Sequence, residues 1–129
     1  MVTPSLLITD DDAALRETMG GLFQPRGFRI LMAADGQEAL QIVEREEVHL
    51  MLLDMHMPRL TGLETLRRVK QFRSLLPCIL LSARCDASLV EQGRRAMAHS
   101  VLAKPVSRQT LTSAVEQALE GAYGWRVRS

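Results

Sequence analysis

Short apolar runs alternate with longer amphipathic stretches along the whole chain. The longer stretches place apolar residues three and four positions apart, which predicts helices with one buried face. Among them, the stretch 87–97 has the weakest apolar stripe. The short runs predict five strands, at residues 6–8, 28–33, 49–53, 78–81 and 101–102.

This alternation predicts an α/β fold in which every strand is followed by a helix. Asp12, Asp35, Asp86 and Ser107 stand where N-caps of four helices are expected, and Glu38 completes a capping-box spacing with Asp35. Right-handed crossovers turn such a chain into a doubly wound (βα)5 three-layer sandwich. We expect a parallel five-stranded sheet in the flavodoxin-like order 2-1-3-4-5, with ligands at the carboxyl ends of the strands.

The composition fits one globular domain. The 129 residues carry 16 Lys and Arg against 15 Asp and Glu, so the net charge of +1 argues against direct binding to nucleic acid. No apolar run approaches the roughly 20 residues that span a bilayer, which predicts a cytoplasmic protein without membrane contact. Cys78 and Cys85 are expected to be free thiols.

Polar residues directly follow four of the predicted strands. Asp10 and Asp11 follow the first, Asp54 the third, Ser82 the fourth and Lys104 the fifth. Carboxylates that converge raise one another's pKa unless a cation neutralises them. An all-oxygen ligand set suits Mg²⁺ or Mn²⁺.

Asp54 beside a bound cation has the properties of a carboxylate nucleophile, and this combination favours phosphoryl transfer. Lys104 is one of only two lysines and is placed to reach both Asp54 and a phosphoryl oxygen. A cis peptide bond between Lys104 and Pro105 would aim the lysine inward. The hydroxyl of Ser82 is a candidate donor to another phosphoryl oxygen.

Five stretches in order resemble the receiver domain of two-component response regulators. They are residues 6–12 with Arg16, 34–40, 53–58 with 62–64, 79–83, and Lys104 with Pro105. The resemblance extends to about Gly121, so we expect a receiver domain at 1–121 and a C-terminal tail or the start of a linker at 122–129. Tyr123 and Trp125 either pack back on the last helix, begin a linker or bind a partner.

The resemblance implies a role for each residue of the cluster. Asp54 would be the phosphoacceptor, which takes its phosphoryl group from the phosphohistidine of a sensor histidine kinase or of a phosphotransfer protein. Asp10 and Asp11 would hold Mg²⁺ together with Asp54 and the backbone carbonyl of Met55. Such a chain is a signalling domain rather than an enzyme, although it assists its own phosphotransfer and dephosphorylation, and it signals to an output domain or protein partner.

Other residues would govern lifetime and switching. By the same resemblance Ser82 is the switch hydroxyl, and His56, Ala83 and Arg84 tune the lifetime of the phosphoryl group. Val101 occupies the position where the family usually has an aromatic switch residue, and Met97 precedes Ala98 where the family usually has Gly-Ala. We expect the loops at 55–62 and 83–88 to respond most to phosphorylation.

Three other functions compete with this interpretation. A phosphorylation-independent receiver-fold interaction module is the main alternative, motivated by Val101. A haloacid-dehalogenase-type phosphatase needs a second Asp where this chain has His56. A flavodoxin-type cofactor binder is disfavoured because three aspartates after the first strand would repel a phosphate.

Overall fold

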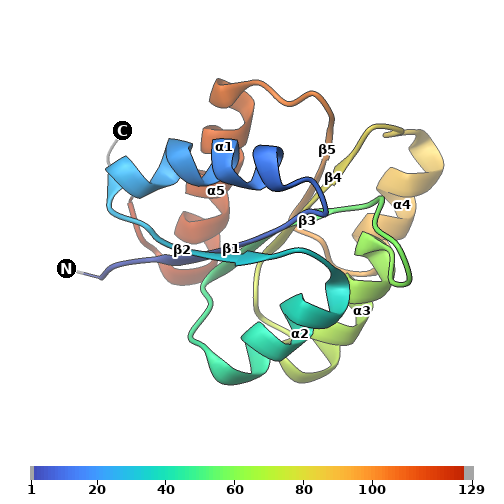
Figure 1. The fold of residues 1–129 in the computed structure, drawn as a ribbon, viewed down its shortest axis with the longest axis horizontal. Coiled ribbons are helices and arrows are strands. Elements are labelled where there is room, and N and C mark those ends of the chain that lie inside the picture. The colour runs from blue at the N-terminus through green and yellow to red at the C-terminus, as the bar shows by residue number, and fades with distance from the viewer. Residues whose placement is uncertain (1, 127–129) are drawn as a thin grey trace.

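The computed structural model describes residues 2–126 as strands and helices in strict alternation (Figure 1). A single turn of 3₁₀ helix, Gln24–Arg26, follows the first helix. The other elements are β1 (Ser5–Thr9), α1 (Ala13–Phe23), β2 (Arg29–Ala33), α2 (Gly36–Arg45), β3 (Leu50–Asp54), α3 (Gly62–Phe72), β4 (Cys78–Ser82), α4 (Ala87–Arg95), β5 (Ser100–Ala103) and α5 (Arg108–Tyr123).

All strands are parallel and lie in the order β2-β1-β3-β4-β5, which confirms the predicted fold class. The register pairs Thr9 with Leu53, Asp54 with Leu81, and Ser82 with Ala103. The carboxyl ends of β1, β3, β4 and β5 are therefore nearly level. The residues that follow these strands meet at one edge of the sheet.

Two hydrophobic cores lie on opposite faces of the sheet. α1 and α5 cover one face, and α2, α3 and α4 cover the other (Figure 1). Alternation along β1 serves both cores, since Leu6 and Ile8 pack towards α1 and α5 while Leu7 packs on the other side. Such strands are apolar throughout because both of their faces are buried.

Side-chain caps begin the helices as predicted. The carboxylates of Asp12, Asp35 and Asp86 and the hydroxyl of Ser107 each accept a backbone N–H in the first turn of the helix that follows. Thr61, which the sequence analysis did not single out, caps α3 in a full capping box with Glu64.

α4 ends at Arg95, two residues before its predicted end. Met97 has φ 67°, a left-handed conformation that a right-handed helix cannot include. The backbone N–H of Ala98 instead bonds the carbonyl of Gly93 and closes the helix. The turn therefore has the left-handed conformation that glycine usually adopts at the end of a helix, but here the residue is Met97.

The end of α5 packs against the start of β3. The Tyr123 hydroxyl donates a hydrogen bond of 2.8 Å to the carbonyl of His49, and the Trp125 ring stacks on Tyr123 with centroids 4.4 Å apart. The His49 ring lies edge-on, 4.9 Å from the Trp125 ring. Tyr123 and Trp125 therefore pack against the domain, as one of the three expectations had it. Their contact is with His49 at the start of β3. The helix continues beyond Gly121, and residues 127–129 of the proposed tail lie outside the described residues.

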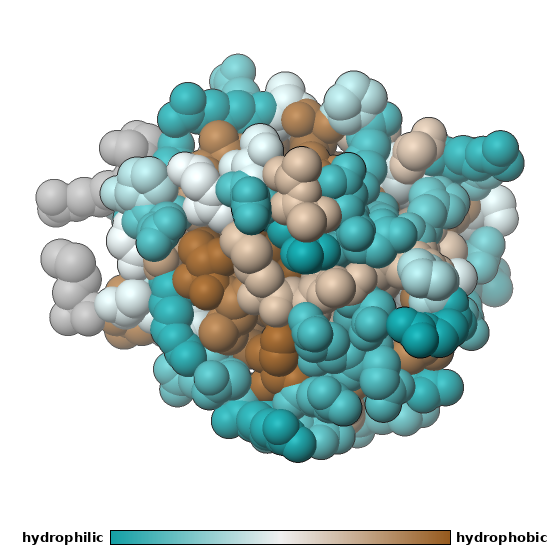
Figure 2. Space-filling model, viewed as in Figure 1, coloured by the Kyte–Doolittle hydropathy of each residue, from teal (hydrophilic) through white to brown (hydrophobic). Residues whose placement is uncertain are grey.

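β2 is an edge strand and is less buried than β1, the strand with which it pairs. Figure 2 shows apolar surface in the middle of the side of the molecule that faces the viewer, where β2 lies between α1 and α2 in Figure 1. Ile30 and Leu31 are half-buried there, and Met32 is 38% exposed. Between residues 2 and 126, no helix has the length and apolar character needed to cross a membrane.

Both cysteines are free thiols, as predicted. Cys78 is buried at the start of β4, and Cys85 is half-buried in the loop before α4. Burial raises the pKa of the Cys78 thiol to about 12.

Candidate functional site

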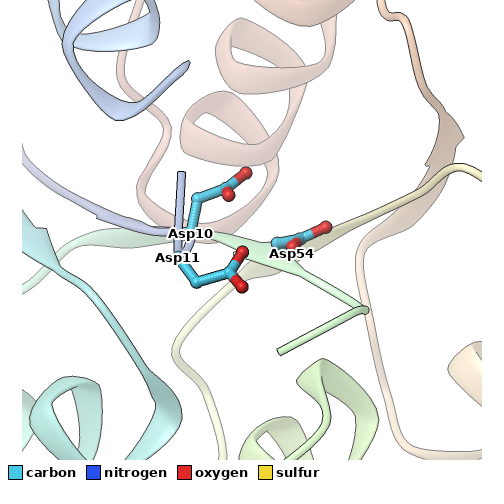
Figure 3. A group of neighbouring side chains, drawn as sticks. All are labelled: Asp10, Asp11 and Asp54. Atoms are coloured by element: carbon cyan, nitrogen blue, oxygen red, sulfur yellow. The ribbon is translucent and has the colours of Figure 1, made fainter. Parts of the chain in front are cut away.

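Three carboxylates converge at the carboxyl edge of the sheet. Asp10 and Asp11 follow β1 and Asp54 ends β3, so the pairing of these two strands brings the three together. Each contributes an oxygen that lies within 4.8 Å of the others, and Figure 3 shows the side chains gathered at one point. Asp10 and Asp54 are buried, whereas Asp11 is exposed to solvent.

Lys104 joins two of these carboxylates. Its Nζ lies 2.8 Å from Oδ2 of Asp10 and 2.9 Å from Oδ1 of Asp54. The lysine directly follows β5, and its backbone N–H donates a 2.8 Å hydrogen bond to the carbonyl of Ser82. The peptide bond between Lys104 and Pro105 is cis.

Burial and neighbouring charges shift the pKa values of Asp54 and Lys104. Burial raises the pKa of the Asp54 carboxyl, and the nearby charge of Asp10 adds to that rise. The hydrogen bond and charge of Lys104 and the backbone N–H of His56 oppose it, but the pKa stays above its ordinary value. Burial lowers the pKa of Lys104, yet its bonds to Asp10 and Asp54 outweigh burial and raise it, so the ammonium stays charged at neutral pH.

Hydrogen bonds from three residues hold Asp10 in place. The Asp12 N–H donates a 2.9 Å hydrogen bond to Oδ1 of Asp10, and the Arg16 guanidinium donates to the Asp10 carbonyl. The two oxygens of the Asp10 carboxylate therefore have different partners, Asp12 on one and Lys104 on the other. This arrangement fixes the direction in which the carboxylate faces Asp54.

Gly62 allows the loop after β3 to fold tightly against the site. Its N–H donates a 2.9 Å hydrogen bond to the Met55 carbonyl. A β-carbon at this position would overlap with the carbonyl oxygen of Asp54. Glycine is therefore required here by the close approach of two backbone segments.

Ser82 lies at the same edge of the sheet, fully buried at the end of β4. Its Oγ accepts a 3.0 Å hydrogen bond from the Arg84 N–H and lies 3.1 Å from Nε2 of His56. Sequence reasoning gave His56 a role in phosphoryl lifetime and Ser82 the role of switch hydroxyl, but it missed the hydrogen bond between them. No motif could have revealed it, because it depends on how two side chains 26 residues apart are oriented.

The remaining predicted residues lie outside the carboxylate cluster. The side chains of Ala83 and Arg84 are exposed at the mouth of the site. Val101 lies in β5 opposite Leu80 and packs, half-buried, against the core beneath α4. A β-carbon on Gly93 of α4 would stand 2.5 Å from Cγ2 of Val101, so helix and strand are already in close contact.

The acidic cluster fits a metal ion. Three carboxylates contribute oxygen, and Lys104 neutralises only part of their negative charge. Hard divalent cations prefer such oxygen ligands. A cation here would lower the repulsion between carboxylates and leave Asp54 ionised and nucleophilic.

Comparison with known proteins identifies the family. A model of the response regulator receiver domain matches residues 6–116, and the chain belongs to this family. It is 32% identical over 119 residues to response regulator RR06 of Streptococcus pneumoniae, covering 92% of this chain and 54% of that protein. It is 30% identical over 119 residues to sporulation initiation phosphotransferase F of Bacillus subtilis, covering 92% of this chain and 96% of that protein.

A solved structure agrees with this assignment. The crystal structure of the CheX–CheY–BeF3–Mg²⁺ complex from Borrelia burgdorferi superposes with a TM-score of 0.86 at 26% identity, covering 90% of this chain and 89% of that one. The chain spans about half the length of several curated relatives, RR06 among them. It is therefore a receiver domain of two-component response regulators.

Proposed function

We propose that Asp54 accepts a phosphoryl group from a phosphohistidine. The observation that carries the proposal is the position of Lys104, whose ammonium contacts Asp10 and Asp54 at 2.8 and 2.9 Å. A lysine bound this way orients the Asp54 carboxylate. It also offers donors to the oxygens of a phosphoryl group that arrives on it.

The transfer exchanges one bond to phosphorus for another. A carboxylate oxygen of Asp54 attacks the phosphorus, an O–P bond forms, and the N–P bond to the donor imidazole breaks. The donor ring leaves with the electron pair of that bond, and it leaves as neutral imidazole because its other ring nitrogen carries a proton. Lys104 stays charged throughout, as the direction of its pKa shift requires, and balances charge on the acyl phosphate.

Asp10, Asp11, Asp54 and the Met55 carbonyl would hold Mg²⁺, or Mn²⁺ in its place. The bound ion would supply positive charge to the phosphoryl oxygens. Among the four ligands, Asp11 is the exposed side chain and is free to turn towards the ion, whereas Asp10 is fixed by Asp12 and Lys104.

The partner in this proposal is a sensor histidine kinase or a phosphotransfer protein, and the phosphorylated chain signals to an output domain or protein. The chain is itself modified, so it acts as a signalling domain that assists its own phosphorylation and dephosphorylation rather than as an enzyme with a separate substrate. The cytoplasmic location expected from the sequence and the receiver boundary at 1–121 remain part of the proposal.

We also propose that the loops at 55–62 and 83–88 change most on phosphorylation. Both loops border Asp54, since the Met55 N–H bonds the Leu81 carbonyl and the Arg84 N–H bonds Ser82. Amide hydrogen exchange with and without beryllofluoride and Mg²⁺ tests this directly. Equal exchange in both loops would contradict it.

Intact mass spectrometry after incubation with acetyl phosphate and Mg²⁺ tests the acceptor. The expected result is an adduct of about 80 Da, the mass of one phosphoryl group, which disappears on chelation and in Asp54→Ala. Asp86→Ser is the matched control, because it removes a carboxylate outside the cluster and keeps a side chain able to cap α4.

Absence of the adduct with acetyl phosphate and with a kinase donor would overturn the proposal. It would favour a phosphorylation-independent docking module. An adduct that persists in Asp54→Ala would instead place the acceptor at another residue.

A further inference from the structure

The hydrogen bond between His56 and Ser82 has no part in the chemistry described above. His56 begins the loop after β3, and its side chain is exposed, whereas the Ser82 hydroxyl it contacts is fully buried. Nε2 of His56 and Oγ of Ser82 are 3.1 Å apart. His56 therefore lies over Ser82 on the solvent side of the site.

The Ser82 oxygen is held from two sides. The Arg84 N–H donates to it at 3.0 Å, and His56 contacts it at 3.1 Å. Among residues 2–126, no hydrogen bond links this hydroxyl to Asp10, Asp11 or Asp54. In the state that the structure describes, Ser82 is engaged away from the acceptor carboxylate.

A phosphoryl group on Asp54 would compete for this hydroxyl. If Nε2 accepts the hydroxyl proton, that proton is unavailable to a phosphoryl oxygen. If Nε2 carries the proton and donates, Oγ is still held in place by two donors. In both tautomers, turning Oγ towards Asp54 breaks the bond to His56.

We propose that His56 is a positioning residue that holds the Ser82 hydroxyl in its resting orientation, so that a phosphoryl group must take this hydroxyl from His56. The inference rests on the proposed acceptor role of Asp54. In this inference His56 affects the phosphorylated state only through its hydrogen bond to Ser82. This effect is distinct from any effect of His56 on the access of water to the site.

A double-mutant cycle with beryllofluoride and Mg²⁺ tests the inference on the full chain. The measured quantity is the dissociation constant for beryllofluoride, obtained by isothermal titration calorimetry. His56→Leu keeps a side chain of moderate size but cannot make the hydrogen bond. It should tighten binding about fivefold, because the bond no longer has to be broken; this equals about 1 kcal/mol.

The same substitution in a Ser82→Ala background should leave the dissociation constant unchanged, since no hydroxyl remains to be held. His56→Gln is the conservative variant, because its amide can reach the serine as Nε2 does, and it should restore the affinity of the unsubstituted chain. Melting temperatures of all variants identify any that fail to fold.

Equal tightening by His56→Leu in both backgrounds would overturn the inference and indicate a steric or solvent effect. So would unchanged affinity in the Ser82-containing chain, or failure of His56→Gln to restore it. If Asp54 gains the acetyl phosphate adduct while the cycle shows no coupling, this inference alone fails. If neither adduct nor beryllofluoride binding occurs, the acceptor proposal fails with it.

Discussion

The cluster of Asp10, Asp11, Asp54 and Lys104 and the α4–β5 segment (residues 87–103) are built differently. In the cluster, charged groups meet at fixed distances, with one lysine joined to two buried carboxylates. In the α4–β5 segment the notable contacts are steric, between Gly93 and Val101 and in the turn at Met97. The cluster keeps the residue types its family resemblance requires, whereas the segment departs from them.

The difference predicts which of these two regions tolerates change better. Phosphoryl chemistry needs particular charges in particular places, so we expect replacement of any one of them to impair phosphoryl transfer. Relaying a change through packed side chains needs only complementary shapes, and several combinations can provide these. Val101 packs beneath Gly93 at the position where the family usually has an aromatic residue.

The largest expected effect on stability lies beside the cluster. Gly62→Ala should lower the free energy of unfolding by about 3 kcal/mol, because its β-carbon would overlap with the backbone of Asp54, which cannot easily yield. Urea unfolding measures it. Gly21→Ala is the control, since nothing lies within 4 Å of a β-carbon there, and it should gain about 0.5–1 kcal/mol. Similar values for both variants would contradict the steric argument.

A smaller loss is expected where α4 meets β5. Gly93→Ala brings a β-carbon against Val101, and overpacking should outweigh the better helix propensity of alanine, for a net loss of about 1 kcal/mol. In a Val101→Ala background the same change should become neutral or stabilising, as judged from urea unfolding of all four chains. Additive losses would show that α4 and β5 are not in contact through this pair.

Met97→Gly should stabilise the chain by about 0.5 kcal/mol. The substitution relieves a left-handed backbone at an exposed residue, and the greater flexibility of glycine in the unfolded chain offsets part of the gain. Thermal unfolding is the measurement. Arg95→Gly, at the last residue of α4, should instead destabilise. A loss in both variants would mean that Met97 contributes packing that outweighs its strain.

The smallest effects concern pH and have opposite signs in the two regions. Because the pKa of Asp54 is raised, its ionised form disfavours folding, so its stabilising contribution is present below pH 3.8 and is lost as pH rises. Without Mg²⁺, Asp54→Asn should therefore exceed the unsubstituted chain in stability at pH 7 and match it in acid.

In α4, hydrogen bonds from Arg94 and Arg95 lower the pKa of Glu91. The contribution of Glu91 is therefore present above pH 4.5 and lost as pH falls through its lowered pKa. Glu91→Gln should lose stability at pH 7 and converge with the unsubstituted chain in acid. Chemical unfolding in EDTA between pH 3 and 7 follows both variants, and curves parallel to that of the unsubstituted chain would refute these assignments.

Pattern alone predicted the parts of the structure that depend on local sequence. Apolar runs located all the strands, and Asp12, Asp86 and Ser107 marked helix starts because their side chains bond the backbone three residues on. The strand order follows from general rules of handedness and connection, so it could be predicted as well. That order then predicted which polar residues would lie together at the carboxyl edge of the sheet.

Features that depend on side-chain orientation could not be predicted this way. The bond between His56 and Ser82, and the stacking of Trp125 on Tyr123, join residues whose meeting is decided by tertiary packing. The end of α4 was missed because a methionine, not a glycine, adopts the left-handed conformation there.

The stack of Trp125 on Tyr123 has a spectroscopic consequence. Trp125 is the only tryptophan of the chain, and it packs at the start of β3, about 16 Å along that strand from Asp54. Its emission therefore monitors whether the end of α5 stays docked on His49. A fluorescence change on loading Asp54 would reveal that the whole length of the sheet takes part in the response.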